Sequence, residues 1–333
     1  MKIGVIGLGY WGPNIVRNFL SNSNVSDLIG CDKSESRLKT IQSKFPNLKL
    51  INNYADLLKD KTIDAVVIAT PVSTHYKLAK AALESGRHIW VEKPFTALTS
   101  DASNLIELAE KKNLRIFVDH TFIYSGAVRK IKELIDKNEL GEIVYYDSVR
   151  INLGLFQHDV NVIWDLAPHD FSIMKYLIHK KVKAVSANGI ANYNTQENIA
   201  HVSVYLEKNC FAHFHVNWTS PVKIRRVLIG GKKKMLVFDD MENYEKIKVY
   251  DSGVEYDTDE GIYNALVQYR IGDMYSPKVE QTEALSLCVK EFVDSILRSR
   301  KPMTSGEDGL EIVKILEASE KSIKNKGRLV EIK

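Results

Sequence analysis

The chain has 333 residues, a length that favours two domains, each able to bury a core of its own. Hydrophobic residues make up 44% and charged residues 26%, the balance of a soluble globular protein. The net charge of +4 is small, and the lysines and arginines are spread along the chain, which argues against a nucleic-acid binding protein. No apolar run approaches the length of a membrane span.

The beginning of the chain and its cysteines favour a cytoplasmic protein. The N-terminus leads directly into an apolar strand and lacks the features of a secretory signal. The three cysteines, Cys31, Cys210 and Cys288, lie far apart and form no CxxC pair, so we interpret them as reduced packing residues.

Residues 1–120 alternate between apolar, strand-like segments and helical patterns such as 74–85 and 100–112. Such alternation predicts a parallel, doubly wound sheet of the Rossmann type, in which ligands bind at the carboxyl ends of the strands. The expected strands cover residues 2–6, 25–31, 48–51, 64–69, 88–91 and 115–118.

The first strand leads into a glycine pattern, Gly7-x-Gly9-x-x-Gly12, followed by a helix from Pro13. Gly7 allows a tight turn, Gly9 lets the backbone approach a pyrophosphate, and Gly12 lets the helix pack closely. Asp32 follows about 20 residues further on, where an acid would bond the ribose hydroxyls of a dinucleotide. The spacing therefore predicts a dinucleotide-binding domain.

The residues around this turn favour NAD over NADP. Asp32 would repel a 2′-phosphate, whereas Lys33 and Arg37 in the same loop could pair with one, so the two signals oppose each other. Tyr10 and Trp11, inside the glycine turn, are also expected to contact the cofactor.

Two loops at the carboxyl ends of the fourth and fifth strands carry further candidates. Thr70 and Pro71 form one turn, and His75 opens the next helix, where we expect it to shape the backbone and contact the dinucleotide. Glu92 and Lys93 end the fifth strand, and both are expected to contact the cofactor. Lys93 would project into the cofactor crevice and hydrogen-bond a substrate oxygen. The alternative is an ordinary surface lysine in a loop.

Residues 121–333 form the second predicted domain. A helix at 126–138 leads into long alternating stretches joined by short turns, which predicts an antiparallel sheet. The expected strands cover 142–152, 183–191, 201–206, 210–218, 225–230, 234–238 and 246–250, and the other helices 165–178, 280–299 and 308–325. Helices on one face leave the other exposed, and both faces carry sizeable side chains, so we predict a homo-oligomer built through this sheet.

A candidate proton-transfer pair lies in the second domain. Pro168 fits the first turn of a helix, which would place Asp165 at or just before the cap and His169 near the N-terminus. The positive end of the helix would lower the pKa of His169 and keep it neutral, as a base for alcohol oxidation requires. The alternative interpretation is that Asp165 only caps the helix and His169 only packs.

His213 and His215 alternate onto one face of the expected strand 210–218. A third ligand at metal spacing is missing, so we expect a packed or interfacial histidine pair and no metal. The sequence also contains no GxSxG elbow, HExxH helix or P-loop lysine.

These motifs together resemble the glucose-fructose oxidoreductase, inositol dehydrogenase and MocA-like (Gfo/Idh/MocA) family. The resemblance implies a Rossmann domain followed by an α/β domain with a large, mostly antiparallel, open-faced sheet that forms a homodimer or homotetramer. It also implies that Lys93 and His169 form a catalytic pair assisted by Asp165, that Lys93-Pro94 is a cis peptide, and that Trp164 contacts the cofactor.

Three segments, 10–19, 164–170 and 218–226, are similar to family members that act on nucleotide-linked sugars, such as UDP-N-acetylglucosamine 3-dehydrogenases. The resemblance implies NAD-dependent oxidation of a sugar secondary hydroxyl, at C3 of a UDP-N-acetylhexosamine or a related nucleotide sugar. Substrate contacts are expected from Tyr124, Lys223, Arg225 and Arg226. The alternatives are a dehydrogenase or reductase of a free sugar or inositol, a redox-neutral hydrolase with tightly held NAD, and a non-catalytic NAD(P)-binding regulator.

Overall fold

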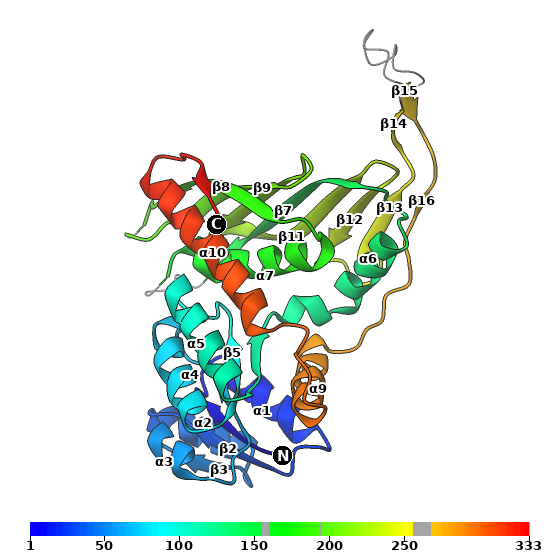
Figure 1. The fold of residues 1–333 in the computed structure, drawn as a ribbon. Helices are drawn as coiled ribbons and strands as arrows, with labels where there is room; N and C mark the ends of the chain where they lie inside the picture. Colours follow the sequence, from blue (N-terminus) through cyan, green and yellow to red (C-terminus); the bar gives the residue numbers. More distant parts are fainter. Residues whose placement is uncertain (155–159, 194, 256–267, 333) are drawn as a thin grey trace. The chain divides into compact units, whose positions relative to one another are not determined.

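The computed structural model describes residues 1–154, 160–193, 195–255 and 268–332 (Figure 1). The chain divides into two compact units. Unit one contains Met1–Tyr124 and Thr282–Glu317, and unit two contains Ser125–Gln281 and Ala318–Lys333.

Unit one contains a parallel sheet of six strands in the order β3-β2-β1-β4-β5-β6, the Rossmann arrangement that the alternating pattern predicts. Every strand lies within two residues of its predicted position. The strands are β1 Lys2–Ile6, β2 Asp27–Cys31, β3 Lys49–Ile51, β4 Ala65–Ile68, β5 His88–Glu92 and β6 Ile116–Asp119. The helices of this unit are α1 Gly12–Leu20, α2 Glu35–Lys44, α3 Tyr54–Lys59, α4 His75–Glu84, α5 Thr99–Lys111 and α9 Ala284–Leu297, with the short η1 Val72–Thr74 and η2 Thr121–Tyr124.

The ranges of the two units differ from the expected domains, because residues 282–317 belong with the first one. Phe292 of α9 packs at 5.7 Å from the ring centroids of Trp90 and Phe117, in the core beside β5 and β6. At the start of α9, Glu283 forms an ion pair of 2.6 Å with Arg17 of α1. Helix α10, Gly306–Lys324, begins in unit one and ends in unit two.

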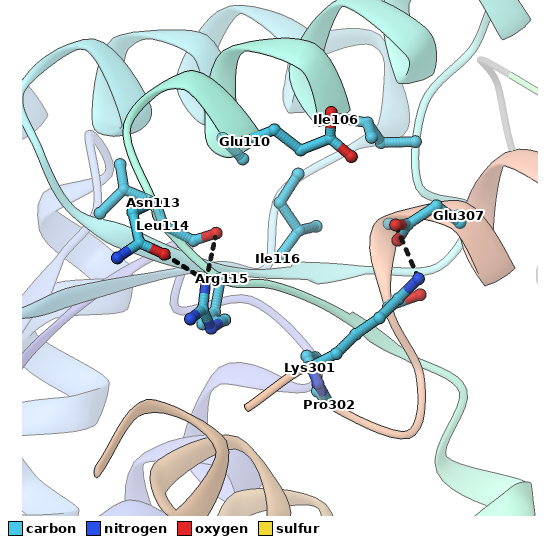
Figure 2. A pocket seen from close by; sticks show the side chains of 12 residues that line it. Ile106, Glu110, Asn113, Leu114, Arg115, Ile116, Lys301, Pro302 and Glu307 are labelled. Carbon is cyan, nitrogen blue, oxygen red and sulfur yellow. Dashed lines mark hydrogen bonds and ion pairs between the residues drawn. The ribbon is translucent and has the colours of Figure 1, made fainter. Parts of the chain in front are cut away.

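A pocket of about 390 Å³ lies at the amino end of β6, where residues of α5 and of the segment 301–307 line it (Figure 2). Its wall includes Arg115, just before β6, and Lys301, which forms an ion pair of 2.7 Å with Glu307. Ligands of doubly wound sheets bind at the opposite edge, where the strands end. The pocket therefore does not mark the dinucleotide site.

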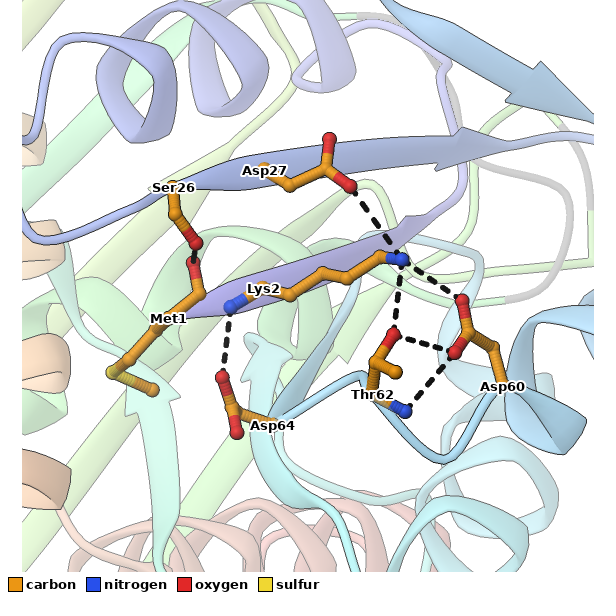
Figure 3. Close-up of polar contacts among 7 residues, drawn as sticks. All are labelled: Met1, Lys2, Ser26, Asp27, Asp60, Thr62 and Asp64. Atoms are coloured by element: carbon orange, nitrogen blue, oxygen red, sulfur yellow. Dashed lines mark hydrogen bonds and ion pairs between the residues drawn. The ribbon is translucent and has the colours of Figure 1, made fainter.

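A polar cluster closes the same amino edge around Lys2 (Figure 3). The Lys2 ammonium lies 2.9 Å from the Asp60 carboxylate, 3.5 Å from Asp27 and 3.0 Å from the Thr62 hydroxyl. The Lys2 backbone N–H donates to Asp64 at 2.8 Å. These contacts join the beginnings of β1 and β2 to the loop before β4.

Unit two is built on a nine-stranded sheet in the order β16-β13-β12-β11-β7-β10-β9-β8-β17. All neighbouring strands are antiparallel except β7 and β10, which are parallel, so the predicted mostly antiparallel sheet is confirmed. Its strands are β7 Ile143–Leu153, β8 Val182–Ile190, β9 Ile199–Leu206, β10 Phe211–Asn217, β11 Thr219–Gly231, β12 Met235–Asp239, β13 Ile247–Tyr250, β16 Met274–Tyr275 and β17 Val330–Glu331. A separate pair joins β14 Gly253–Glu255 to β15 Gln268–Arg270.

Helices α6, Gly126–Asp136, and α7, Val162–Leu177, lie on one face of this sheet (Figure 1). Phe214 of β10 faces α7, and its ring centroid lies 4.7 Å from that of Phe171. The alternate side chains of the sheet point to the opposite face, where Tyr145, Tyr205 and Phe211 are between 36% and 41% exposed.

No helix among the described residues is long and apolar enough to span a membrane. Cys31, Cys210 and Cys288 are free and buried, as the sequence predicts.

Candidate active site

The glycine turn after β1 has the backbone geometry that the sequence predicts. Gly7 has a φ of +98°, and a Cβ at this position would lie 2.3 Å from the Ala69 carbonyl oxygen, so only glycine fits. A Cβ at Gly9 would meet only the Arg37 guanidinium, at 3.7 Å, which leaves the outer side of the turn accessible to a pyrophosphate. Gly12 starts α1, whose first turn contains no acidic residue to oppose an anion.

Asp32, at the end of β2, is tied to this turn. It is 5% exposed, and its carboxylate accepts hydrogen bonds from the backbone N–H groups of Leu8 at 2.8 Å and Ser34 at 2.9 Å. The Arg37 guanidinium lies 3.6 Å from the same carboxylate, whereas Lys33 is exposed. An acid and an arginine thus share the position where the 2′ group of a bound dinucleotide is read.

The aromatic residues of the turn lie on the surface. Tyr10 is 82% exposed and Trp11 49%, and their rings meet edge to face at 5.5 Å. The glycine turn, Asp32 and the exposed rings of Tyr10 and Trp11 together fit a bound dinucleotide.

His75 connects the loops that follow β4 and β5. Its Nδ1 lies 2.9 Å from the Pro94 carbonyl oxygen and its Nε2 lies 2.8 Å from that of Thr70. Pro71 precedes η1, and α4 begins at His75 as predicted. The side chain is fully buried, so His75 shapes the backbone of these two loops, and its contact with a dinucleotide stays a prediction.

Lys93 follows the last residue of β5, and the peptide bond between it and Pro94 is cis, as the resemblance implies. The side chain of Lys93 is partly exposed. The neighbouring Glu92, which is also expected to contact the cofactor, is paired in the strand register with Asp119 at the end of β6.

Helix α7 begins earlier than predicted, at Val162, with Asn161 as its cap. The Asn161 side chain accepts hydrogen bonds from the N–H groups of Ile163 and Trp164, and Pro168 lies inside the helix instead of in its first turn. His169 is therefore two turns from the helix end, and the expected influence of the helix dipole on it does not apply, because that influence fades within the first turn.

Asp165 and His169 are four residues apart on α7, so their side chains share one face of the helix. The Asp165 carboxylate does not cap the helix; it accepts a hydrogen bond of 3.0 Å from the Trp218 indole. Trp164 is 6% exposed and its indole donates to Glu320 at 3.2 Å, so it packs inside unit two, and its contact with the cofactor stays a prediction.

A buried ion pair next to His169 was not found from the sequence. Arg150 of β7 donates two hydrogen bonds, of 2.7 and 2.9 Å, to the carboxylate of Asp170 on α7. Both side chains are at most 5% exposed, so the pair anchors the helix to the sheet at the residue that follows His169. The two residues are distant in sequence and belong to different elements, so no local pattern pairs them.

The four residues expected to contact substrate differ in their surroundings. Tyr124 is 2% exposed and its hydroxyl lies 3.1 Å from that of Thr304, so it is a core residue of unit one, and its contact with substrate stays a prediction. Arg225 and Arg226 form ion pairs with Asp240 at 3.3 Å and Asp239 at 2.7 Å. Lys223 is exposed on β11.

The histidines of β10 share the open face of the sheet with His201 of β9. The His201 ring stacks on that of His215 at 4.3 Å, and His213 Nδ1 lies 3.0 Å from Asp147. Burial lowers the pKa of His201 and His215, and the neighbouring histidines add to this effect. In the part of the chain that the structure describes, no three His, Cys, Asp or Glu side chains converge as metal ligands.

Family models and full-length relatives agree with this architecture. The model of an oxidoreductase family with an NAD-binding Rossmann fold matches residues 1–120, and the model of the GFO/IDH/MocA C-terminal domain matches 128–237. The myo-inositol 2-dehydrogenase of Thermotoga maritima is 23% identical over 98% of this chain and 97% of its own length. The scyllo-inositol 2-dehydrogenase (NADP(+)) IolW of Bacillus subtilis is 23% identical over 98% and 94%.

The UDP-N-acetylglucosamine 3-dehydrogenase GnnA from Acidithiobacillus ferrooxidans has a similar solved structure. The TM-score is 0.80 at 22% identity, and the alignment covers 98% of both chains, so the likeness concerns the fold. The two family models together match well over half of this chain. It belongs to the Gfo/Idh/MocA family and is an NAD(P)-dependent oxidoreductase with an NAD(P)-binding Rossmann domain.

Proposed function

We propose that this chain oxidises the C3 hydroxyl of a UDP-N-acetylhexosamine, or of a related nucleotide sugar, with NAD as the hydride acceptor. The observation that carries the proposal is the placement of Lys93 at the carboxyl end of β5, in a loop that His75 ties to the loop after β4. That edge of the sheet is where a dinucleotide binds. Segments 10–19, 164–170 and 218–226 supply the resemblance to enzymes of nucleotide sugars.

The proposed chemistry is the one that the family resemblance implies for Lys93, His169 and Asp165. His169 accepts the proton of the substrate hydroxyl, and the Lys93 ammonium donates a hydrogen bond to the same oxygen as negative charge develops on it. Asp165 lies one turn before His169 on α7 and helps to orient the imidazole. The indole of Trp218 holds the Asp165 carboxylate in place.

The preference for NAD is part of the proposal. Asp32 is held in position by two backbone N–H groups, so its charge stays beside the ribose of a bound dinucleotide. Arg37 opposes this preference, because its guanidinium is close enough to pair with a 2′-phosphate if the aspartate were removed.

We further propose that the protein self-associates through the open face of the nine-stranded sheet as a homodimer or homotetramer. Tyr205 and Phe211 are neighbours there, with ring centroids 5.4 Å apart, and Tyr145 pairs with Phe211 in register. Exposed aromatic side chains gathered on one sheet face are typical of subunit contacts. Light scattering tests this proposal. The Tyr205→Lys/Phe211→Lys variant should have a smaller molecular mass in solution than the unsubstituted protein.

A second candidate substrate is a free cyclic polyol or sugar. Two relatives matched over nearly their whole length are named as inositol dehydrogenases, and one of them uses NADP. Arg225 and Arg226, which could otherwise meet a diphosphate, are engaged by Asp240 and Asp239, and this favours a substrate without phosphate.

A panel of substrates separates the two candidates. Purified protein and NAD are incubated with UDP-N-acetylhexosamines carrying deuterium at C3, and in parallel with inositols and free aldoses. Deuterium recovered in the NADH supports oxidation at C3 of the nucleotide sugar. NADH formed only with the polyols contradicts the nucleotide-sugar proposal and supports the second candidate.

A further inference from the structure

His169 directly follows an interruption in the hydrogen bonding of α7. Pro168 lies inside this helix and has no N–H group, so it cannot donate the bond that another residue here would donate to the Trp164 carbonyl. A group that accepts a proton from a substrate must keep its place to within about 0.5 Å. Contacts other than the helical hydrogen bonds are therefore expected to hold the segment around His169.

Polar contacts attach α7 to the sheet on both sides of the proline. Before it, the Asp165 carboxylate accepts a hydrogen bond of 3.0 Å from the indole of Trp218, which follows the last residue of β10. After it, the Asp170 carboxylate accepts two hydrogen bonds, of 2.7 and 2.9 Å, from Arg150 of β7. His169 therefore lies between two attachments, and the strands that provide them, β7 and β10, are neighbours in the sheet.

Asp170 is bound to β7 through both its side chain and its backbone. The Arg150 guanidinium meets the carboxylate with two N–H groups, and such a forked contact fixes orientation as well as distance. The hydroxyl of Tyr146, also on β7 and fully buried, donates to the Asp170 carbonyl at 3.4 Å. The Ser172 hydroxyl donates to the His169 carbonyl at 2.7 Å. Together these contacts hold the backbone at both residues that follow the proline.

The burial of the ion pair indicates what it contributes. Arg150 is 4% exposed and Asp170 is 2% exposed. Taking two charges out of water costs free energy that their attraction roughly offsets, so apolar side chains of similar size could stabilise the fold equally well. Apolar contacts do not fix a direction, however, whereas two parallel hydrogen bonds do. The ion pair therefore contributes geometry more than stability.

We propose that Arg150 and Asp170 are positioning residues, which hold His169 in place for proton transfer after the interruption at Pro168. The inference rests on the proposed role of His169 as the base. Arg150 acts through Asp170, and Asp170 acts through the backbone that it shares with His169. A displaced imidazole would slow the chemical step more than it weakens substrate binding, because proton transfer requires hydrogen-bonding distance.

A variant without either charge separates geometry from stability. Arg150→Met/Asp170→Leu leaves no buried charge unpaired, so it should fold, with a Tm within a few degrees of the unsubstituted protein and an equal affinity for NAD. With whichever substrate of the panel above reduces NAD, kcat should fall at least about tenfold while KM changes less than about threefold.

Arg150→Lys keeps both charges and loses only the fork, so its kcat should lie between those of the double variant and the unsubstituted protein. An unchanged kcat in both variants, or a loss that appears only in KM, overturns the inference.

A second ion pair near the same helix and strand provides the control. Lys180 lies beyond the end of α7, forms an ion pair of 3.3 Å with Glu142 and donates to the Ile143 carbonyl at 2.8 Å, at the start of β7. Lys180→Met should lower the Tm and leave kcat unchanged. A loss of kcat as large as that of the double variant would mean that any contact between these elements suffices, which overturns a specific role for Arg150 and Asp170.

Hydrogen exchange tests the positioning without substrate. In the double variant the backbone amides of residues 169–172 should exchange at least about tenfold faster than in the unsubstituted protein, while those of β12 keep their rates. Unchanged exchange at 169–172 overturns the inference, whatever the substrate proves to be. Absence of turnover with every substrate of the panel would contradict the sugar-oxidation proposal, so the two failures are distinguishable.

Discussion

The two edges of the six-stranded sheet carry the same kinds of side chain in different surroundings. At the amino edge Lys2 forms ion pairs with Asp60 and Asp27 on the surface of unit one, where water screens them (Figure 3). At the carboxyl edge Lys93 follows Glu92, which is paired in the strand register with the buried Asp119, and burial raises the pKa of both carboxyl groups. Burial, more than residue type, therefore decides in which direction the pKa of a carboxyl group near a lysine is shifted.

The pocket at the amino edge supports the same conclusion (Figure 2). It is concave and lined in part by charged side chains, including Arg115 and Glu307, yet it lies where β6 begins. The carboxyl edge carries the glycine turn, Asp32 and Lys93. The direction of the strands locates the site better than concavity does.

The largest expected effect compares the two lysines. Lys93→Met should lower kcat by about 10²- to 10⁴-fold, because the oxygen of the substrate loses its charged donor. NAD binding, measured by fluorescence titration, should remain. Lys2→Met should leave kcat unchanged and lower the Tm, since it breaks partly exposed ion pairs at the amino edge only. Equal losses of kcat in the two variants would remove the distinction between the edges.

Two glycines with positive φ provide the next comparison. Gly7→Ala should reduce NAD affinity at least about tenfold and destabilise the fold, because the new methyl group would lie 2.3 Å from a backbone oxygen. Gly86 precedes β5 at the amino edge with a φ of +81°, and a Cβ added there would have no atom within 4 Å. Gly86→Ala should cost only the conformational strain, roughly 1–2 kcal/mol by urea unfolding, with NAD affinity retained.

The choice of cofactor should depend on Asp32. In Asp32→Ser the affinity for NADP relative to NAD should rise about tenfold or more, because the Arg37 guanidinium, now 3.6 Å from the aspartate, can pair with the 2′-phosphate. Isothermal titration measures both affinities. Adding Arg37→Ala should cancel the gain, and a gain that persists would assign phosphate binding to another residue.

The smallest expected effects concern how the stability of the fold changes with pH, and they have opposite signs at the two edges. Hydrogen bonds from Thr62 and Lys2 lower the pKa of Asp60, so its stabilisation is present above the unfolded pKa of about 4 and is lost as the pH falls through the folded value. Burial raises the pKa of Glu92, so stability is instead lost as the pH rises.

The difference in Tm between about pH 5 and about pH 2 measures the first effect, and the difference between about pH 7 and about pH 4 measures the second. In the unsubstituted protein Asp60 adds to the first difference, so this difference should become smaller in Asp60→Asn. Glu92 subtracts from the second difference, so this one should become larger in Glu92→Gln. Changes of the same sign would show that the two edges titrate alike.

Local patterns predict much of this molecule. Short apolar runs predict the strands of unit one, and the glycine pattern predicts the tight turn in which Gly7 adopts a positive φ. The alternating pattern also predicts β7 to β13 of the nine-stranded sheet, because side chains on a half-exposed sheet alternate in polarity.

What the sequence does not predict depends on distant partners. Helix α7 begins six residues before Pro168, because Asn161 caps it and the helix tolerates the proline inside it. The pairing of Arg150 with Asp170, and of Glu92 with Asp119, requires knowing which elements become neighbours. The return of residues 282–317 to unit one likewise depends on packing of Phe292 in a core formed by residues far earlier in the chain.

The most direct test of the central claim is the absorbance of NADH when purified protein and NAD are mixed with a UDP-N-acetylhexosamine, with Lys93→Met measured alongside. The account predicts a rise with the unsubstituted protein and at most a few per cent of that rate with the variant, at equal NAD occupancy. A variant that reduces NAD as fast as the unsubstituted protein would contradict the role of the carboxyl edge. Tight NAD binding without reduction by any nucleotide sugar, inositol or aldose would contradict the proposed oxidation.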